Sequence, residues 1–231
     1  IIAADAKSED DLTRLARRLV NAVPPALIAG SAGISVALAD EMSADRMLRK
    51  EPVIGPGDRG RRVFIVTASQ RTIVEKQLAV LGSSMDLVVA ELSLDEVPRG
   101  VDDESITQIK ESAKKDGVVV LKLSDAEASL GVTKDETIAL SKTIVQNLGS
   151  TVRKITDEVK LDTLIVIGGD TASGVIEACG VASLELQGEL QPGTVSGVAL
   201  DGSITDSLLI TRSGGFGGEH ALLELVTLLE F

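Results

Sequence analysis

The stretch from Leu161 to Gly180, LDTLIVIGGDTASGVIEACG, constrains the fold more than any other part of this chain. It contains four consecutive large aliphatic residues, Leu164–Ile167, a run typical of a strand covered on both faces of a parallel sheet. Gly168–Gly169 then allow a sharp turn, and a helix opened by Asp170 and Thr171 is expected to follow. The sequence therefore predicts a strand, a glycine turn and a helix in direct succession.

A turn of this kind can bind a phosphate. The first N–H groups of a helix have no partner within the helix, and the positive end of the helix dipole lies there. Asp170 or Thr171 could cap whichever N–H groups a ligand leaves free. An ordinary strand-to-helix connection with an N-cap explains the same residues equally well, so both interpretations stay open at this point.

The rest of the chain alternates strands and helices in the manner of an α/β fold. Strands are expected over residues 1–4, 25–29, 63–66, 87–90 and 118–123, and helices over 8–19, 33–39, 70–81, 104–115 and 134–148, the last with an extension or a second helix over 151–160. Shorter strands over 183–186, 195–200 and 207–211 follow without helices between them. The predicted fold class is α/β, a mostly parallel sheet flanked by helices, with a late run of short strands before a closing helix.

Composition excludes several functional classes. A formal net charge of −12 argues against nucleic-acid binding, because phosphate backbones require clustered Lys and Arg. The single histidine, His220, excludes a multi-histidine zinc site, and its interpretation as a structural residue argues against a Ser-His-Asp triad. The single cysteine, Cys179, indicates core packing and a reducing, cytoplasmic setting.

One uncharged stretch, Leu19–Ala39, has the length of a membrane span. Pro24–Pro25 interrupt it, Gly30 and Gly33 lie inside it, and many of its apolar residues are small alanines. A strand, a turn and a buried helix explain it better, so no membrane association is expected.

Three further turns are candidates for ligand contact. Thr67-Ala68-Ser69-Gln70 follows a predicted strand, and Ser69 is interpreted either as a ligand contact or as a helix N-cap. Gly214-Gly215-Phe216-Gly217-Gly218 is a second strand–turn–helix junction that suits an anion, with Arg212 placed to add a positive charge. Gly30-Ser31-Ala32-Gly33 could also approach a ligand, although tight helix packing explains it equally well.

A dinucleotide pattern, G-x-G-x-x-G at Gly55–Gly60, lies in the predicted linker over residues 50–62. It precedes a strand instead of following one and opens no helix, which argues against an NAD-dependent oxidoreductase. The Walker sequence of P-loop proteins is absent, so any nucleotide must be bound by a different turn.

The turn motifs together resemble those of a known family. Gly30–Gly33, the Val66–Ser69 turn with Gln77, Gly168–Thr171 and Gly214–Gly217 occur in the order and approximate spacing seen in the four-carbon acid sugar kinases. The likeness covers nearly the whole chain and is to the C-terminal, nucleotide-binding domain of that family. The expected organisation is one nucleotide-binding α/β domain over residues 1–231, forming the C-terminal part of a longer two-domain kinase.

The resemblance implies transfer of the γ-phosphoryl group of ATP, with Mg²⁺, to the terminal hydroxyl of threonate, erythronate or 3-oxo-tetronate. ATP would face an N-terminal sugar-acid-binding domain of the same polypeptide, and a homo-oligomer is compatible with this organisation. The nucleotide contacts carried over to this sequence are Ser69, Gly168, Gly169, Asp170, Thr171, Gly214 and Gly215, and no side chain is assigned as a metal ligand.

The chain departs from the family pattern in three places. Thr67-Ala68-Ser69 replaces the usual Ser-Gly-Ser, and Arg212 stands where Lys is commoner. The family's N-terminal acidic motif, two Asp followed by Thr-Gly-Ala, is absent, so the catalytic residues are expected in the N-terminal domain. This chain alone is therefore expected to bind nucleotide without turning over a sugar acid. The alternative hypothesis is a non-catalytic, ligand-sensing module that binds a sugar phosphate or a nucleotide.

Overall fold

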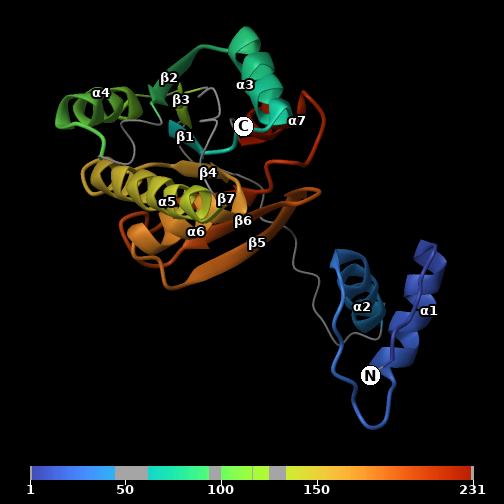
Figure 1. Ribbon diagram of the computed structural model, residues 1–231. Coiled ribbons are helices and arrows are strands. Elements are labelled where there is room, and N and C mark those ends of the chain that lie inside the picture. The colour runs from blue at the N-terminus through green and yellow to red at the C-terminus, as the bar shows by residue number, and fades with distance from the viewer. Residues whose placement is uncertain (1, 45–61, 94–99, 116, 125–133, 230–231) are drawn as a thin grey trace. The chain divides into compact units, whose positions relative to one another are not determined.

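The computed structural model describes residues 2–44, 62–93, 100–115, 117–124 and 134–229 (Figure 1). The chain divides into two compact units, Ile1–Pro52 and Val53–Phe231. The first unit contains α1 (Glu9–Val20) and α2 (Ala32–Ala44). The strands of the second unit are β1 (Arg62–Thr67), β2 (Leu87–Leu92), β3 (Gly117–Leu123), β4 (Thr163–Ile167), β5 (Leu184–Gln191), β6 (Thr194–Ala199) and β7 (Leu208–Arg212). Its helices are α3 (Thr72–Ser84), α4 (Asp103–Ala113), α5 (Lys134–Thr156), α6 (Gly169–Ala178) and α7 (Ala221–Leu229).

The seven strands form one sheet in the order β2-β3-β1-β4-β7-β6-β5. The first five are parallel, and β6 and β5 add an antiparallel edge, which confirms the predicted fold class. The register pairs Thr67 with Ile167 and Ile167 with Arg212, so β1, β4 and β7 end side by side. The chain leaves β1 toward β2 and leaves β4 toward β5, at opposite edges of the sheet. The carboxyl ends of β1 and β4 are therefore the switch point at which α/β proteins commonly bind ligands.

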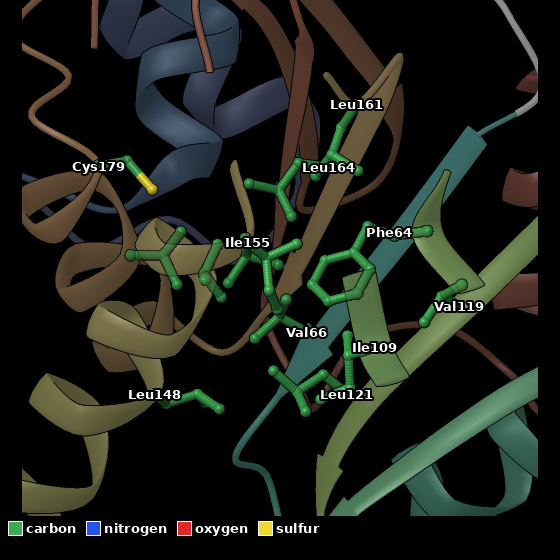
Figure 2. Close-up of a cluster of buried hydrophobic side chains, with 14 of the residues drawn as sticks. Phe64, Val66, Ile109, Val119, Leu121, Leu148, Ile155, Leu161, Leu164 and Cys179 are labelled. Atoms are coloured by element: carbon green, nitrogen blue, oxygen red, sulfur yellow. The ribbon is translucent and has the colours of Figure 1, made fainter. Parts of the chain in front are cut away.

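Two layers of helices cover the sheet, because alternate residues of each buried strand point to opposite faces. On one face, Phe64, Val66 and Leu164 pack with residues of α4, α5 and α6. Figure 2 shows this cluster, in which Leu148 and Ile155 of α5 approach the strands and Cys179 lies at one side. On the other face, α3 and α7 supply the partners of the intervening strand residues.

The thiol of Cys179 is fully buried, which confirms its predicted place in the core. Burial raises the pKa of this thiol, and the hydroxyl groups of Ser203 and Thr156 partly oppose that rise. A buried thiol with a raised pKa is unreactive, so a catalytic role is not supported.

The first unit differs from the sequence prediction. The strands expected over residues 1–4 and 25–29 were wrong for the described residues, which have no strand pairing there. A strand requires a neighbour for its backbone hydrogen bonds, and no described segment of this unit supplies one. The helix start was correct: Ser8 is the N-cap of α1 and accepts a hydrogen bond from the N–H of Asp11 at 3.2 Å.

The remaining predictions concern boundaries. The expected helices over 134–148 and 151–160 form one helix, α5. The predicted linker and the Gly55–Gly60 pattern lie outside the described residues, apart from Arg62, which begins β1. The single domain over residues 1–231 stays a prediction beside the observed division into two units.

The uncharged stretch Leu19–Ala39 is divided between two helices. α1 ends at Val20 and α2 begins at Ala32, with Pro24 and Pro25 in the non-helical segment between them. In the part of the chain that the structure describes, none of the helices combines the length and apolar character that crossing a bilayer requires.

A partly buried ion pair joins the start of β1 to the residue before β4. Nε and Nη2 of Arg62 donate to the two carboxylate oxygens of Asp162 at 2.9 and 2.8 Å, and the N–H of Arg62 donates at 3.0 Å. Burial by itself raises the pKa of Asp162, but the hydrogen bonds and the positive charge of Arg62 outweigh it, so the pKa is lowered. The folded state therefore favours the ionised carboxylate.

We expect Asp162→Asn to lower the free energy of unfolding at pH 7 by about 1–3 kcal/mol, because it removes charge-assisted hydrogen bonds. A lowered pKa in the folded state stabilises the protein above the ordinary carboxyl pKa, and this contribution disappears as the pH falls through the folded value. In urea unfolding, the difference between the variant and the wild type should therefore shrink below about pH 4. A difference that stays constant with pH would contradict this assignment. Asp206→Asn, which removes an exposed pair with Lys160 at 3.8 Å, is the matched control.

Candidate functional site

The turns after β1, β4 and β7 line one cavity of about 440 Å³. The sheet brings them together because the three strands are neighbours and run in the same direction. Six of the seven predicted site residues line this cavity: Ser69, Gly168, Gly169, Asp170, Thr171 and Gly214. The seventh, Gly215, follows directly in the chain and is not among the lining residues.

The turn after β4 leaves backbone N–H groups without partners. Gly168 has a φ of 109°, is the N-cap of α6 and provides no side-chain cap. The N–H of Gly168 donates to the carbonyl of Arg212 at 2.8 Å, which ties this turn to the end of β7. The next three N–H groups, those of Gly169, Asp170 and Thr171, have no hydrogen-bond partner among the described residues. The prediction that Asp170 or Thr171 caps the helix was wrong, because α6 begins one residue earlier.

The turn after β1 is held by the hydroxyl of Thr67, which is 1% exposed. This hydroxyl donates to the carbonyl of Ile167 at 3.3 Å and accepts from the N–H of Ser69 at 3.1 Å. Ser69 Oγ accepts from the N–H of Arg71 at 3.4 Å. The N-cap of α3 is Arg71, so the alternative interpretation of Ser69 as an N-cap was wrong. The Ser69 hydroxyl faces the cavity with capacity for a further hydrogen bond.

The turn after β7 packs directly on the turn after β1. A Cβ atom on Gly214 would lie 2.9 Å from Ser69 Oγ, and one on Gly215 would lie 3.3 Å from Arg71 Nη1. The N–H groups of Gly214 and Gly215 have no partner among the described residues. Two glycine turns, after β4 and after β7, therefore present unbonded N–H groups at the same edge of the sheet.

The sequence suggested that Arg212 adds a positive charge to an anion site, but its side chain lies outside the cavity. Arg212 is 3% exposed and does not line the cavity. Nη2 donates to the carbonyl of Phe216 at 2.9 Å, and burial lowers the pKa of this side chain. The positive side chain that does line the cavity is Arg71, which is exposed at the start of α3.

The sequence also did not reveal the apolar side chains that line the cavity, called its apolar wall below. Leu140, Ile144 and Val145 of α5 also line the cavity. The helical spacing of Leu140 and Ile144 was visible in the sequence, but this spacing is equally typical of a core stripe. Gly30–Gly33, the other candidate turn, belongs to the first unit.

The arrangement suits a ligand with a phosphate end and a less polar end. Backbone N–H groups at helix starts and glycine turns bind phosphate oxygens, and Arg71 adds a positive charge. The apolar residues of α5 can cover a flat, apolar group. Asp170 is the carboxylate of the cavity, and the described residues contain no group of three His, Cys, Asp or Glu side chains that could hold a metal. One carboxylate fits a Mg²⁺ that arrives with nucleotide phosphates, because Mg²⁺ usually takes few protein ligands.

Comparison with known proteins agrees with this geometry. Residues 64–222 match the family described as the nucleotide-binding C-terminal domain. The D-threonate kinase of Salmonella typhimurium is 24% identical over 244 residues, which cover 100% of this chain and 54% of the kinase. The chain thus spans about half the length of this curated relative.

Solved structures share the fold. A Haemophilus influenzae protein superposes with a TM-score of 0.68 at 17% identity, covering 98% of this chain and 53% of its own. A domain of unknown function from Bordetella bronchiseptica, a domain-swapped dimer with bound citrate, has a TM-score of 0.59 at 21% identity, with coverage of 98% and 51%.

Proposed function

We propose that the cavity at the ends of β1, β4 and β7 binds ATP, because this chain belongs to the nucleotide-binding C-terminal domain family of the four-carbon acid sugar kinases. The observation that carries the proposal is the convergence of two glycine turns with unbonded N–H groups at the switch point of the sheet. In this pose the N–H groups after β4 and β7 bind phosphate oxygens, Ser69 donates to the nucleotide, and α5 covers its less polar part.

The full polypeptide would transfer the γ-phosphoryl group of ATP to the terminal hydroxyl of threonate, erythronate or 3-oxo-tetronate. The similarity to a D-threonate kinase supports this reaction class. Phosphoryl transfer depends mainly on positioning and charge neutralisation, which backbone donors supply on the nucleotide side and Mg²⁺ supplies when bound with ATP. The acceptor pocket and the catalytic base would belong to an N-terminal domain, so this chain alone would bind nucleotide without turnover. A cytoplasmic location, where ATP is available, completes the proposal.

The exposed apolar surface of the first unit supports the proposal that this chain contacts an N-terminal partner domain. Ile2 and Leu27 are 95% and 102% exposed, and among the described residues of this unit the buried core consists of Ala16, Ile34 and Ala37. A cavity of about 720 Å³ lies among its apolar residues. Such a small core leaves much apolar surface uncovered, and large exposed apolar patches usually mark an interface. We assign this surface to contact with the sugar-acid-binding domain of the same polypeptide.

The proposal is tested by isothermal titration calorimetry of this chain with ATP and ADP in the presence of Mg²⁺. We expect saturable binding of both nucleotides and no consumption of ATP when threonate, erythronate or 3-oxo-tetronate is added. Preference for the phosphorylated sugar acids over ATP in a thermal-shift panel would instead support the ligand-sensing alternative. Absence of nucleotide binding by the full polypeptide would overturn the proposal.

We expect Ser69→Ala to weaken ATP binding by about 1 kcal/mol, or roughly fivefold, because it removes one neutral hydrogen bond. Ser83→Ala is the matched control, since Ser83 is exposed and donates to the carbonyl of Val80 at 2.9 Å within α3. Calorimetry should show unchanged affinity for this control. Equal affinity of both variants and the wild type would remove Ser69 from the nucleotide site.

A further inference from the structure

Two buried side chains, those of Gln77 and Arg212, donate to backbone carbonyls within residues 213–218, called the glycine loop below. Gln77 of α3 is 1% exposed, and its Nε2 donates to the carbonyls of Phe216 and Gly218 at 3.2 and 2.9 Å. Arg212, 3% exposed, donates from Nη2 to the same Phe216 carbonyl at 2.9 Å. Both donors therefore act on one peptide unit of the loop.

The loop backbone rests directly on these two donors. Gly217 has a φ of 82°, and a Cβ atom there would lie 2.5 Å from Ala221 Cβ. The same Cβ atom would lie 3.2 Å from Arg212 Nη2 and 3.6 Å from Gln77 Nε2. A side chain at this position would separate the loop from its donors, so the contact requires glycine.

Phe216, whose carbonyl is held, also closes the turn that carries the unbonded N–H groups. The N–H of Phe216 donates to the carbonyl of Ser213 at 3.3 Å, which makes Gly214 and Gly215 the central residues of a four-residue turn. The N–H of Gly168 binds the Arg212 carbonyl at 2.8 Å and holds the other end of this turn. With both ends held, the peptide planes of Gly214 and Gly215 have little freedom to rotate.

Stability alone does not account for Arg212. Its Nε and Nη1 have no hydrogen-bond partner among the described residues, although the side chain is almost fully buried. Burying a charged group with unmet donors is unfavourable, and burial accordingly lowers its pKa. An apolar side chain of similar size would be less costly at this position. The specific contact that Arg212 makes is with the glycine loop.

We propose that Gln77 and Arg212 are positioning residues that hold the glycine loop so that the N–H groups of Gly214 and Gly215 face the phosphates of the nucleotide. This inference rests on the proposed function, since it assigns the loop to the ATP site. Neither side chain touches the nucleotide, and both act through the Phe216 carbonyl. Their loss should therefore weaken binding by releasing the loop.

The test uses Gln77→Met and Arg212→Met, which keep side-chain volume and remove the donors. We expect each variant to raise the Kd for ATP by about tenfold, as expected for loss of a hydrogen bond to a positioned loop. Hydrogen–deuterium exchange of the Phe216 N–H, which is hydrogen-bonded to the Ser213 carbonyl, should become faster without nucleotide, while exchange in β4 and α5 stays unchanged. Arg212→Lys keeps a donor and should restore most of the affinity.

The matched control is Ser207→Ala, at the opposite end of β7. Ser207 is 1% exposed and its Oγ donates to the Leu161 carbonyl at 2.7 Å. This variant should lower the melting temperature yet leave the Kd for ATP and the exchange of residues 213–218 unchanged. It separates loss of stability from loss of loop position.

The double variant Gln77→Met/Arg212→Met gives a second readout. Because both donors act on the Phe216 carbonyl, its loss of affinity should be smaller than the product of the two single losses. Unchanged loop exchange in both single variants, or unchanged affinity in a chain whose wild type binds ATP, would overturn the inference. If the wild type binds no nucleotide, the proposed function fails. Loop exchange then still decides whether these residues hold the loop.

Discussion

The substitution Gly169→Val is expected to abolish ATP binding while the protein stays folded. Gly169 is exposed at the start of α6, and a Cβ atom added there meets no atom within 4 Å. The Cβ atom of valine therefore disturbs no protein contact. The valine side chain enters the cavity beside three unbonded N–H groups and excludes the phosphate that they would bind. We expect a loss of at least about 100-fold in affinity, or about 3 kcal/mol.

Calorimetry and circular dichroism of the same samples check this prediction. Ser173→Val is the matched control, because it places valine at an exposed position of α6 outside the cavity lining. The control should bind ATP as the wild type does. Unfolding of the Gly169→Val variant would make Gly169 a structural residue, and undiminished binding would place the phosphates away from α6.

The substitution Gly174→Val is expected to destabilise the second unit by about 3 kcal/mol or more. α5 and α6 pack backbone to backbone: a Cβ atom on Gly174 would lie 2.3 Å from Val145 Cγ1 and 2.9 Å from the Val145 carbonyl. On the facing helix, a Cβ atom on Gly149 would lie 2.4 Å from the Gly174 carbonyl. Backbone atoms cannot move aside without shifting a whole helix, so overpacking here exceeds the usual cost.

Urea unfolding measures this loss, with Gly169→Ala in the same helix as the control. Alanine at position 169 meets no atom and favours the helix, so its free energy of unfolding should equal or slightly exceed that of the wild type. If Gly174→Val lowers the free energy of unfolding by less than about 1 kcal/mol, α5 moves easily to make room for the valine. Since Val145 also lines the cavity, such movement would reshape its apolar wall.

The candidate site could be predicted from the sequence where it depends on local chemistry. Gly168–Thr171 and Gly214 were identified because glycine pairs after an aliphatic run indicate a turn that can approach a ligand. Ser69 was identified because a hydroxyl follows a strand directly. The side chains of α5 were missed, since an apolar residue on a helix has the same spacing whether it faces the core or a cavity. Arg212 was placed wrongly because a strand-end residue can point to either face of the sheet.

The sequence by itself determined the alternation of strands and helices in the second unit, the glycine turns and the closing helix. These features follow from hydrophobic periodicity and from the conformational range of glycine, which act over a few residues. Only the tertiary structure decided that β1, β4 and β7 are neighbours, that α5 closes the cavity, and that Gln77 reaches Phe216. Strand order depends on long-range packing, and so does the contact between Gln77 and Phe216, which lie 139 positions apart. A local sequence pattern does not predict such contacts. The same reason explains residues 25–29, where a strand-like sequence found no neighbouring strand to pair with.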